Sequence, residues 1–327
     1  MFAMTSKTVP ALAAALALLG VMQTDVLAQT YPNKPIRLIV PYPPGGGLTP
    51  TARLIGQKLT ESWGQQVLVD NRAGANTVIG TEAVAKALPD GYTLLFQANS
   101  HLLTPLLLPT PYDPIRDFSP IATLTVSEFG LVVNPSVRAG NLQELVALAK
   151  ARPGQLNYAT PGSGNVTHMA IELVILMTGI KMLQVPYKGS GPAMTDLLGG
   201  QVEVYMGVSA NVIPHVRSGK LTGIAVSGDR RLRSMPQVPT LAEAGLPAFK
   251  LTAWTGFFSP AGTPRAIIDK LALETNKVVA TADFREKIAE QALDPFILTT
   301  EQFAALIKSD TANFIEVIKN SNIKLEQ

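Results

Sequence analysis

Two glycine-rich turns are the segments of this chain whose residue types and spacing favour ligand chemistry. The first is Pro43-Pro44-Gly45-Gly46-Gly47 and the second is Pro161-Gly162-Ser163-Gly164. Each follows a β-rich run and precedes a helical pattern, so unpaired backbone N–H groups and the helix dipole together favour an anion. Glycine lets the anion approach because no Cβ blocks the backbone. The turns therefore predict a site for a small molecule with an acid group at each end, or with one acid group shared by both.

Each turn alone is a weak signal, because a tight turn in any α/β protein also uses glycine and proline. Gly162-Ser163-Gly164 begins like a dinucleotide-binding motif, but Thr167 stands where the third glycine is required, and a phosphate-binding P-loop is absent from the sequence. Pro161 stands two residues before Ser163, so the nucleophile elbow of a hydrolase is also missing. We therefore expect no cofactor and no catalytic residue.

Hydroxyl side chains near both turns add hydrogen-bond donors. Thr49 and Thr51 follow the first turn, and Thr160, Ser163 and Thr167 lie in and around the second. In open α/β sheets, ligands bind beyond the carboxyl ends of the strands, which is where these residues are expected. The hydroxyls are therefore candidates for contact with the ligand.

The three histidines receive different interpretations. His101 follows Asn99-Ser100 at a strand end that faces the presumed cleft, so a pocket role competes with a structural one. His168 is expected to cap or line the second turn. Glu172 lies four residues later on the same helix face, but this pair alone makes neither a catalytic triad nor a zinc site. His215 is expected to be structural.

The composition excludes several functional classes. The chain has 327 residues, 46% apolar and 16% charged, which is too apolar for a disordered protein and long enough for one large or two ordinary domains. With no cysteine there is no disulfide, thiolate nucleophile or cysteine-bound metal, and three scattered histidines argue against a metal site. The net charge of +3, without clustered basic residues, argues against nucleic acid as a partner.

Residues 1–28 have the layout of a secretory signal peptide. Lys7 supplies the basic segment, Ala11–Met22 is an apolar run, and Val26-Leu27-Ala28 is a small-x-small cleavage site. The run is shorter than the roughly 20 residues of a membrane-spanning helix, and a buried N-terminal helix is the alternative. We expect cleavage near Ala28-Gln29 and export of the mature chain.

Strand patterns alternate with helical patterns along the rest of the chain. Ile36–Val40 and Thr93–Ala98 are β-rich runs, and residues 50–63 form an amphipathic segment for which Thr49 is a plausible N-cap and Pro50 suits the first turn. The C-terminal part is mostly helical. Strands separated by helix-length segments predict right-handed βαβ units and mostly parallel sheets that helices cover on both faces.

A series of short motifs extends from the first glycine turn across nearly all of the mature chain. They are Pro41-Tyr42-Pro43-Pro44-Gly45-Gly46-Gly47 with Ala52-Arg53, Val69-Asp70-Asn71-Arg72-Ala73-Gly74, Pro89-Asp90-Gly91-Tyr92-Thr93, Pro111-Tyr112-Asp113-Pro114, Tyr158-Ala159-Thr160-Pro161-Gly162-Ser163-Gly164 with His168, Val185-Pro186-Tyr187-Lys188-Gly189, Asp196-Leu197-Leu198-Gly199-Gly200-Gln201-Val202, Val238-Pro239-Thr240 and Pro260-Ala261-Gly262-Thr263-Pro264. In this order the motifs resemble the substrate-binding receptors of the tripartite tricarboxylate transporters, also called Bug receptors. Each motif is short, but together they are highly specific.

The resemblance implies an α/β periplasmic-binding-protein fold of the Venus flytrap type, in which each of two lobes has a mostly parallel sheet flanked by helices. Lobe one is expected to comprise residues 29–125 and 252–327, and lobe two residues 126–251. Two hinge crossings are expected near residues 124–130 and 250–255, with the C-terminal helices packed on lobe one. Such lobes close around a ligand by hinge motion.

The resemblance also implies a ligand and partners. A small organic mono- or dicarboxylate would be held by backbone N–H groups of both glycine turns and by ordered waters, in the periplasm, without a cofactor. The complex, expected to be monomeric, would be delivered to membrane permease subunits. The expected ligand-binding residues are Tyr42, Pro44, Gly45, Gly46, Gly47, Leu48, Thr49, Asn99, Ser100, His101, Thr160, Gly162, Ser163, Gly164, Asn165, Thr167 and His168.

One position departs from the family pattern. Family members often carry an acid after the first turn, in a Gly-Gly-Thr-Asp pattern, where this chain has Leu48-Thr49. Without that carboxylate an ammonium group lacks its anchor, so we expect amine-free mono- or dicarboxylates, including aromatic ones, with Leu48 as an apolar wall. Tight binding of aspartate or glutamate, together with no binding of amine-free acids, would contradict this hypothesis.

Replacing Gly46 with aspartate is expected to abolish ligand binding, because a side chain and a like charge would enter the carboxylate site. Calorimetric titration of the folded variant measures the effect. Wild-type affinity in that variant would count against the assigned site.

Two other functions remain open on sequence alone. One is a ligand-presenting partner of a membrane sensor kinase, which the sequence does not distinguish from a transport receptor. The other is a secreted hydrolase of carboxylate esters, which would need a positioned nucleophile and base that the motifs do not supply.

Overall fold

The computed structural model of the protein describes residues 31–44, 48–162, 164–187, 189–291 and 293–320. The expected signal peptide, Gly45, Gly46, Gly47 and Ser163 lie outside the described residues. Within the described ranges, no helix has both the length and the hydrophobicity that crossing a membrane requires.

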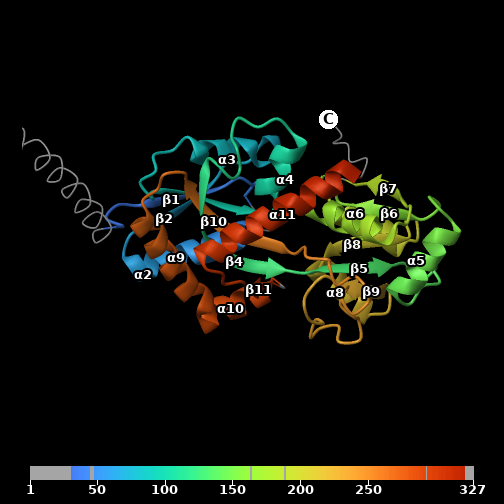
Figure 1. Ribbon diagram of the computed structural model, residues 1–327. Coiled ribbons are helices and arrows are strands. Elements are labelled where there is room, and N and C mark those ends of the chain that lie inside the picture. The colour runs from blue at the N-terminus through green and yellow to red at the C-terminus, as the bar shows by residue number, and fades with distance from the viewer. Residues whose placement is uncertain (1–30, 45–47, 163, 188, 292, 321–327) are drawn as a thin grey trace, which may run out of the picture.

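The described strands form two separate sheets, one in each lobe (Figure 1). The six-stranded sheet has the order β11-β4-β10-β3-β1-β2, and the five-stranded sheet has the order β7-β6-β8-β5-β9. The strands of the first sheet are β1 (Ile36–Val40), β2 (Val67–Asn71), β3 (Thr93–Ala98), β4 (Phe118–Ser127), β10 (Ala253–Pro260) and β11 (Asp294–Pro295). The strands of the second sheet are β5 (Phe129–Val133), β6 (Asn157–Thr160), β7 (Leu183–Pro186), β8 (Val204–Val208) and β9 (Thr222–Val226).

Helices flank both sheets. In Figure 1, α3 and α4 lie above the six-stranded sheet, and α2, α9 and α10 lie below it. The helices of this part are α2 (Thr49–Trp63), the 3-10 helix η1 (Ala75–Thr77), α3 (Val78–Ala85), α4 (Ser100–Leu107), α9 (Arg265–Ala280), α10 (Ala282–Ala289) and α11 (Thr300–Asn320). The helices of the other lobe are α5 (Leu142–Ala151), α6 (Val166–Thr178), α7 (Ser190–Leu198) and α8 (Ser209–Arg217).

Both sheets are mixed, which corrects the expectation of mostly parallel sheets. β1 runs parallel to β2 and β3, and β6 runs parallel to β7 and β8, as βαβ units require. However, β10 is antiparallel to β3 and β4, β11 is antiparallel to β4, and β5 is antiparallel to β8 and β9. For β5 and β10 the physical reason is the path of the chain. A strand that arrives from the other lobe starts at the edge where the parallel strands end, so it must run against them.

The N-terminal half of lobe one follows the sequence pattern closely. The strands Ile36–Val40 and Thr93–Ala98 have the expected bounds, and α2 ends at Trp63 as expected. The expected N-cap of α2 is wrong, because the cap position is Leu48 and Thr49 is already helical. The hydroxyl of Thr49 donates to the carbonyl of Pro43 and accepts from the side chain of Asn71, at 3.3 and 3.1 Å, so it ties the turn to β2.

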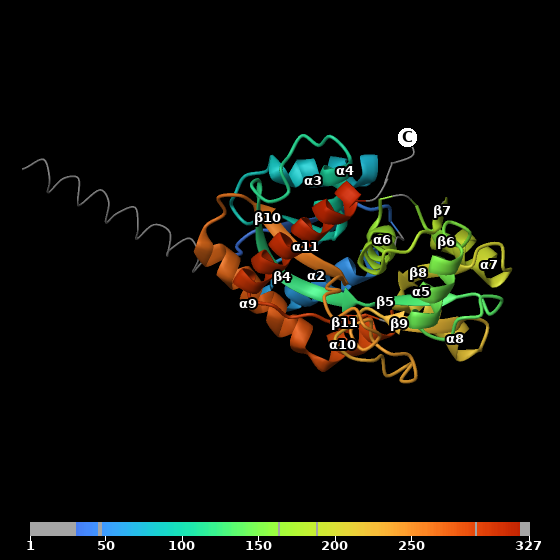
Figure 2. The same cartoon turned by 45° about the vertical axis from the view of Figure 1, so that its right-hand side comes forward.

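The chain passes between the lobes in two places. It leaves the first sheet at Ser127 and enters the second at Phe129, and it returns to the first sheet at Ala253. One helix also joins the lobes by contacting both of them, which was not expected from the sequence. α11 contacts β4 and α4 of lobe one and also α6 of lobe two, and Figure 2 shows it reaching from one lobe toward the other. The C-terminal helices therefore do not pack on lobe one alone.

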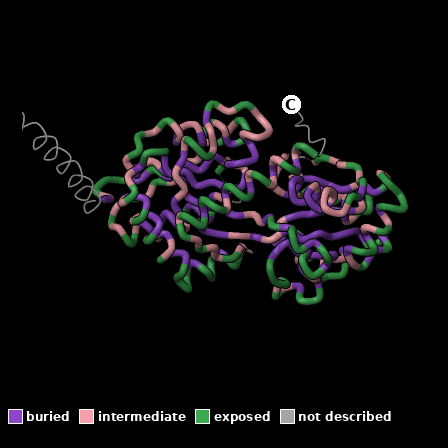
Figure 3. The backbone as a smooth tube through the Cα atoms, in the orientation of Figure 1, coloured by how far each residue is buried: buried purple, intermediate pink, exposed green. Residues whose placement is uncertain are grey.

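The buried residues follow the two sheets and the helix faces that cover them (Figure 3). Leu38, Phe96 and Phe257 are fully buried in the first sheet, and Val204 and Tyr205 are fully buried in the second. Besides a buried cluster in each lobe, a third cluster contains residues of both sheets, such as Leu95 and Leu131. Burial of this apolar surface is the main stabilising contribution to folding. Each lobe is therefore a firm frame for the turns at the ends of its strands.

Candidate functional site

A cavity of about 410 Å³ lies between the two lobes. It sits beyond the carboxyl ends of β1 and β3, where the sequence places ligands in an α/β sheet. Its lining on lobe one is Tyr42, Leu48, Asn76, Thr77, Ala98, Asn99, Ser100, Leu103, Thr104, Leu107 and Leu108, and on lobe two Gly164, Asn165 and Val166. Six residues of the expected site, Tyr42, Leu48, Asn99, Ser100, Gly164 and Asn165, thus meet around one cavity.

The polar end of this cavity is a cluster formed by Tyr42, Ser100 and Gln97. The hydroxyl oxygens of Tyr42 and Ser100 lie within hydrogen-bond distance of each other, and each also lies within hydrogen-bond distance of Oε1 of Gln97, so two hydroxyl protons face three contacts. The backbone N–H of Ala98 donates to the same oxygen, at 3.0 Å. Burial raises the pKa of Tyr42 to about 12, so its hydroxyl stays protonated. Because an amide oxygen has two lone pairs, three donors exceed its capacity, and the Ser100 hydroxyl is free to turn toward a ligand.

Asn99 lines the cavity, but its side-chain amide serves the lobe junction. Its Nδ2 donates to the carbonyl of Thr252 at 3.1 Å and to Oδ2 of Asp310 at 3.4 Å. Its Oδ1 accepts from the backbone N–H of Trp254, at 3.0 Å. The amide that was expected to bind the ligand therefore joins the end of β3 to the start of β10 and to α11.

His101 does not line the cavity, which corrects its assignment as a pocket residue. Its ring is fully buried, stacks on Phe258 at 4.2 Å between centroids, and lies edge-on to Phe118. Its Nε2 is 2.8 Å from the carbonyl of Pro114, and burial lowers its pKa to about 4. The ring is therefore neutral and structural. It follows Ser100 on α4, and consecutive residues on a helix point in different directions.

The second glycine turn has fewer free donors than the sequence indicated. The backbone N–H of Gly164 donates to Nδ1 of His168 at 3.0 Å, so it is already paired. Asn165 is the N-cap of α6, and its Oδ1 accepts from the backbone N–H of His168 and from the hydroxyl of Thr167. The cap of α6 is therefore Asn165, and the ring of His168 holds the turn through Gly164 instead of facing this cavity.

The remaining expected residues that the structure describes do not line the cavity; they are Pro44, Thr49, Thr160, Gly162 and Thr167. Thr49 and Thr167 directly follow the lining residues Leu48 and Val166. The buried hydroxyl of Thr160 accepts from the side chain of Gln184, at 2.9 Å. Thr51, expected as a further donor, is fully buried and donates to Gln291. The hydroxyls of Thr51 and Thr160 therefore make hydrogen bonds within the protein.

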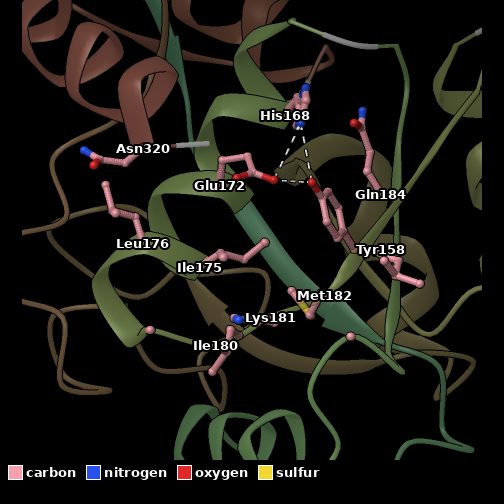
Figure 4. A pocket seen from close by; sticks show the side chains of 13 residues that line it. Tyr158, His168, Glu172, Ile175, Leu176, Ile180, Lys181, Met182, Gln184 and Asn320 are labelled. Atoms are coloured by element: carbon pink, nitrogen blue, oxygen red, sulfur yellow. Dashed lines mark hydrogen bonds and ion pairs between the residues drawn. The ribbon is translucent and has the colours of Figure 1, made fainter. Parts of the chain in front are cut away.

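A second cavity, of about 670 Å³, lies on lobe two between α6, the β6–β7 edge and the end of α11 (Figure 4). At one side of it, Tyr158 donates to Oε1 of Glu172, and Nε2 of His168 lies 3.4 Å from the Tyr158 hydroxyl and 3.8 Å from the same Glu172 oxygen. Burial and the Glu172 carboxylate raise the pKa of Tyr158. With Nδ1 of His168 accepting from Gly164, Nε2 carries the proton and points at these two partners. These contacts orient the ring of His168, which in turn accepts the backbone N–H of Gly164 in the glycine turn.

The sequence did not predict that η1 contributes Asn76 and Thr77 to the lining of the cavity between the lobes. Ala75, Asn76 and Thr77 have φ values of 45°, 49° and 76°, so three consecutive residues other than glycine are left-handed. Thr77 is buried, and its hydroxyl oxygen has no hydrogen-bond partner among the described residues. Backbone strain of this kind concentrates at ligand sites. The signal in the sequence, a single Gly74 before Ala75, was too weak to find it.

Replacing Ala75 with glycine is expected to raise the free energy of unfolding by about 0.5–1 kcal/mol, because it relieves a left-handed backbone at an exposed residue. Urea denaturation measures the change. The matched control is Ala304→Gly on the exposed face of α11, where the same substitution should lower stability by about 1 kcal/mol. Equal losses of stability in Ala75→Gly and Ala304→Gly would show that the left-handed backbone at Ala75 is not strained.

Replacing Asp310 with asparagine is expected to remove a pH dependence of stability. Burial raises the pKa of Asp310 to about 6, above its ordinary 3.8, so the folded state takes up a proton first. Wild-type stability should therefore gain on the order of 2–3 kcal/mol, relative to the variant, as pH falls from about 7 to about 4. Denaturation at both pH values measures this, with Glu316→Gln on exposed α11 as control. A wild-type stability that falls relative to Asp310→Asn over this range would contradict the raised pKa.

Comparison with known proteins places the chain beside transport receptors. The profile of the tripartite tricarboxylate transporter family receptor, TctC, matches residues 51–323. Protein BugT of Bordetella pertussis is 38% identical over 304 residues, which cover 92% of this chain and 93% of BugT. An R. palustris protein solved with adipate is 30% identical, with a TM-score of 0.73 over 90% of this chain and 99% of that one. MatC from Rhodopseudomonas palustris with bound malate is 29% identical, with a TM-score of 0.69 over 88% and 100%.

Proposed function

Because the chain belongs to the receptor family of the tripartite tricarboxylate transporters, we propose that it binds a small amine-free organic carboxylate between its lobes and delivers it to the membrane permease of such a transporter. The observation that carries the proposal is the cavity between the lobes, to which the segment after β1, the 3-10 helix η1, β3, α4 and α6 all contribute residues. Two relatives were solved with adipate and malate, which are small organic carboxylates.

The carboxylate is proposed to lie at the polar end of the cavity. There the Ser100 hydroxyl and the start of α4 favour an anion, and the backbone N–H groups of Gly45, Gly46 and Gly47 would complete the site. Among the described lining residues there is no acidic side chain to receive an ammonium group. This supports the preference for amine-free acids inferred from Leu48-Thr49.

The proposed lobes are residues 29–125 with 252–327, and residues 126–251. The two crossings of the chain at Ser127–Phe129 and before Ala253 would act as hinges, and α11 would follow the motion because it contacts both lobes. Export to the periplasm after cleavage near Ala28-Gln29 remains part of the proposal, as does delivery by the monomer.

A thermal-shift screen over organic acids tests the function, since a ligand that binds only the folded state raises the melting temperature. We expect amine-free carboxylates to raise it and aspartate and glutamate to leave it unchanged. Incubation of each hit with the protein, followed by mass spectrometry, should return the acid unaltered. A screen in which no carboxylate shifts the melting temperature would overturn the proposal.

A further inference from the structure

The cavity between the lobes is polarised along α4. Ser100, Leu103, Thr104 and Leu107 all line it, and their spacing of three, four and seven residues places them on one face of the helix. Ser100 is the first residue of this face and Leu107 the last, about 10 Å further along the helix axis. Leu108 continues the apolar end. The cavity therefore has a hydroxyl end and a leucine end.

The electrostatics of α4 strengthen this polarity. The N-terminal end of a helix carries partial positive charge and favours an anion, whereas the C-terminal end carries partial negative charge and disfavours one. Ser100 stands at the N-terminal end of α4 and Leu107 at the C-terminal end. One carboxylate of a ligand is therefore stabilised at the Ser100 end, and a second carboxylate near Leu107 would meet both a dipole of the wrong sign and apolar side chains.

Compensating charges are missing from the described lining. None of the described lining residues is Lys, Arg, His, Asp or Glu. Moving an ionised carboxylate into such surroundings without a cation costs several kcal/mol per ion. A diacid would therefore lose affinity relative to a monoacid of the same shape.

Two neutral polar side chains of the lining, Thr104 and Asn165, are already engaged. The hydroxyl of Thr104 donates to the carbonyl of Asn76 at 3.0 Å, and the amide of Asn165 donates to the carbonyl of Gly162 at 2.8 Å. Val166 adds a further apolar contact from lobe two. The side chain of Asn76 offers a neutral amide, which suits a neutral polar group of the ligand without balancing a full charge.

We propose that this site selects monocarboxylates with an apolar chain or ring over dicarboxylates of the same size. The proposal rests on the function proposed above and narrows its ligand class. It separates this chain from the relatives solved with adipate and malate, both of which are dicarboxylates. The acid group binds at the Ser100 end, and the apolar body lies against Leu103, Leu107 and Leu108.

Calorimetric titration of the full mature chain with two matched pairs tests the selection. Hexanoate and adipate have the same chain length, and 4-methylbenzoate and terephthalate have the same ring, so each pair differs by one carboxylate. We expect the monoacid of at least one pair to bind about tenfold or more tighter than its diacid. Diacids that bind as tightly as their monoacids in both pairs would overturn the selection while leaving carboxylate binding intact. If neither monoacid binds, the proposed selection is also overturned. The thermal-shift screen over organic acids then tests separately whether the protein binds any carboxylate.

A charge placed at the leucine end gives a second test. Leu107 is partly exposed. Lysine at this position puts an ammonium group at the C-terminal end of α4, where a cation is favoured. We expect it to raise diacid affinity about tenfold and to lower monoacid affinity, because the lysine replaces part of the apolar wall. Leu107→Met controls for packing, and Leu88→Lys, on an exposed residue outside the cavity, controls for net charge. An unchanged ratio of diacid to monoacid affinity in folded Leu107→Lys would refute the placement of the second end.

Discussion

Replacing Trp254 with alanine is expected to lower the free energy of unfolding by about 4 kcal/mol. Trp254 is fully buried near the start of β10, where the chain re-enters lobe one. Its ring packs against Phe303 and Phe258, with centroids 5.3 and 6.3 Å apart. Its Nε1–H donates to Oδ2 of Asp310 at 2.7 Å. The substitution leaves a cavity and also removes a hydrogen bond from a buried carboxyl group.

Trp254→Phe separates the two contributions, because it keeps most of the apolar packing and removes the N–H donor. We expect a loss of about 1–3 kcal/mol for this variant, which is the usual cost of leaving a buried polar group without its partner. Urea denaturation of both variants at neutral pH measures the losses. A loss below about 1 kcal/mol for Trp254→Ala would show that the junction of β10 and α11 does not depend on this side chain.

Replacing Ser100 with alanine is expected to weaken carboxylate binding tenfold to hundredfold, which corresponds to about 1.4–2.8 kcal/mol for a hydrogen bond to a charged group. The physical reason is the excess of donors around Gln97, which leaves the Ser100 hydroxyl available to a ligand at the polar end of the cavity. Titration calorimetry with the tightest acid from the thermal-shift screen measures the loss.

The stability of Ser100→Ala should remain close to wild type, since Tyr42 and Ala98 still satisfy the Gln97 oxygen. Ser136→Ala, on an exposed residue of lobe two, is the matched control and should bind normally. If Ser100→Ala retains wild-type affinity, the hydroxyl belongs to the internal cluster alone and the polar end of the site must be placed elsewhere.

The candidate site was only partly predictable, and the residues of α4 show why. The sequence predicted a strand end at Ala98 and a ligand near Asn99-Ser100, because strand ends follow from local patterns. It did not separate Ser100, which lines the cavity, from His101, which lies in the core. Leu103 and Leu107 also line the cavity, and their helical spacing alone does not distinguish them from core residues. Which side of a helix meets a cavity depends on segments that are distant in sequence.

The second glycine turn shows the same limit in its backbone. The glycines predicted free N–H groups at the start of α6, but the ring of His168 takes up the N–H of Gly164. That ring is in turn held near Glu172 and Tyr158, which come from α6 and β6. A hydrogen bond between a turn and a side chain depends on how strand and helix pack, and residue spacing alone does not report it.

The sequence by itself determined the α/β class, the transporter-receptor family and the two turns near which a carboxylate is proposed to bind. These follow from local causes: hydrophobic periodicity, the backbone freedom of glycine, and short motifs that survive in order. The tertiary structure decided the antiparallel strands at the lobe junction, the bridge formed by α11, the left-handed wall of η1 and the polarity of the cavity along α4. Each of these depends on which distant surfaces pack together, since burial and long-range hydrogen bonds act between residues that the sequence keeps far apart.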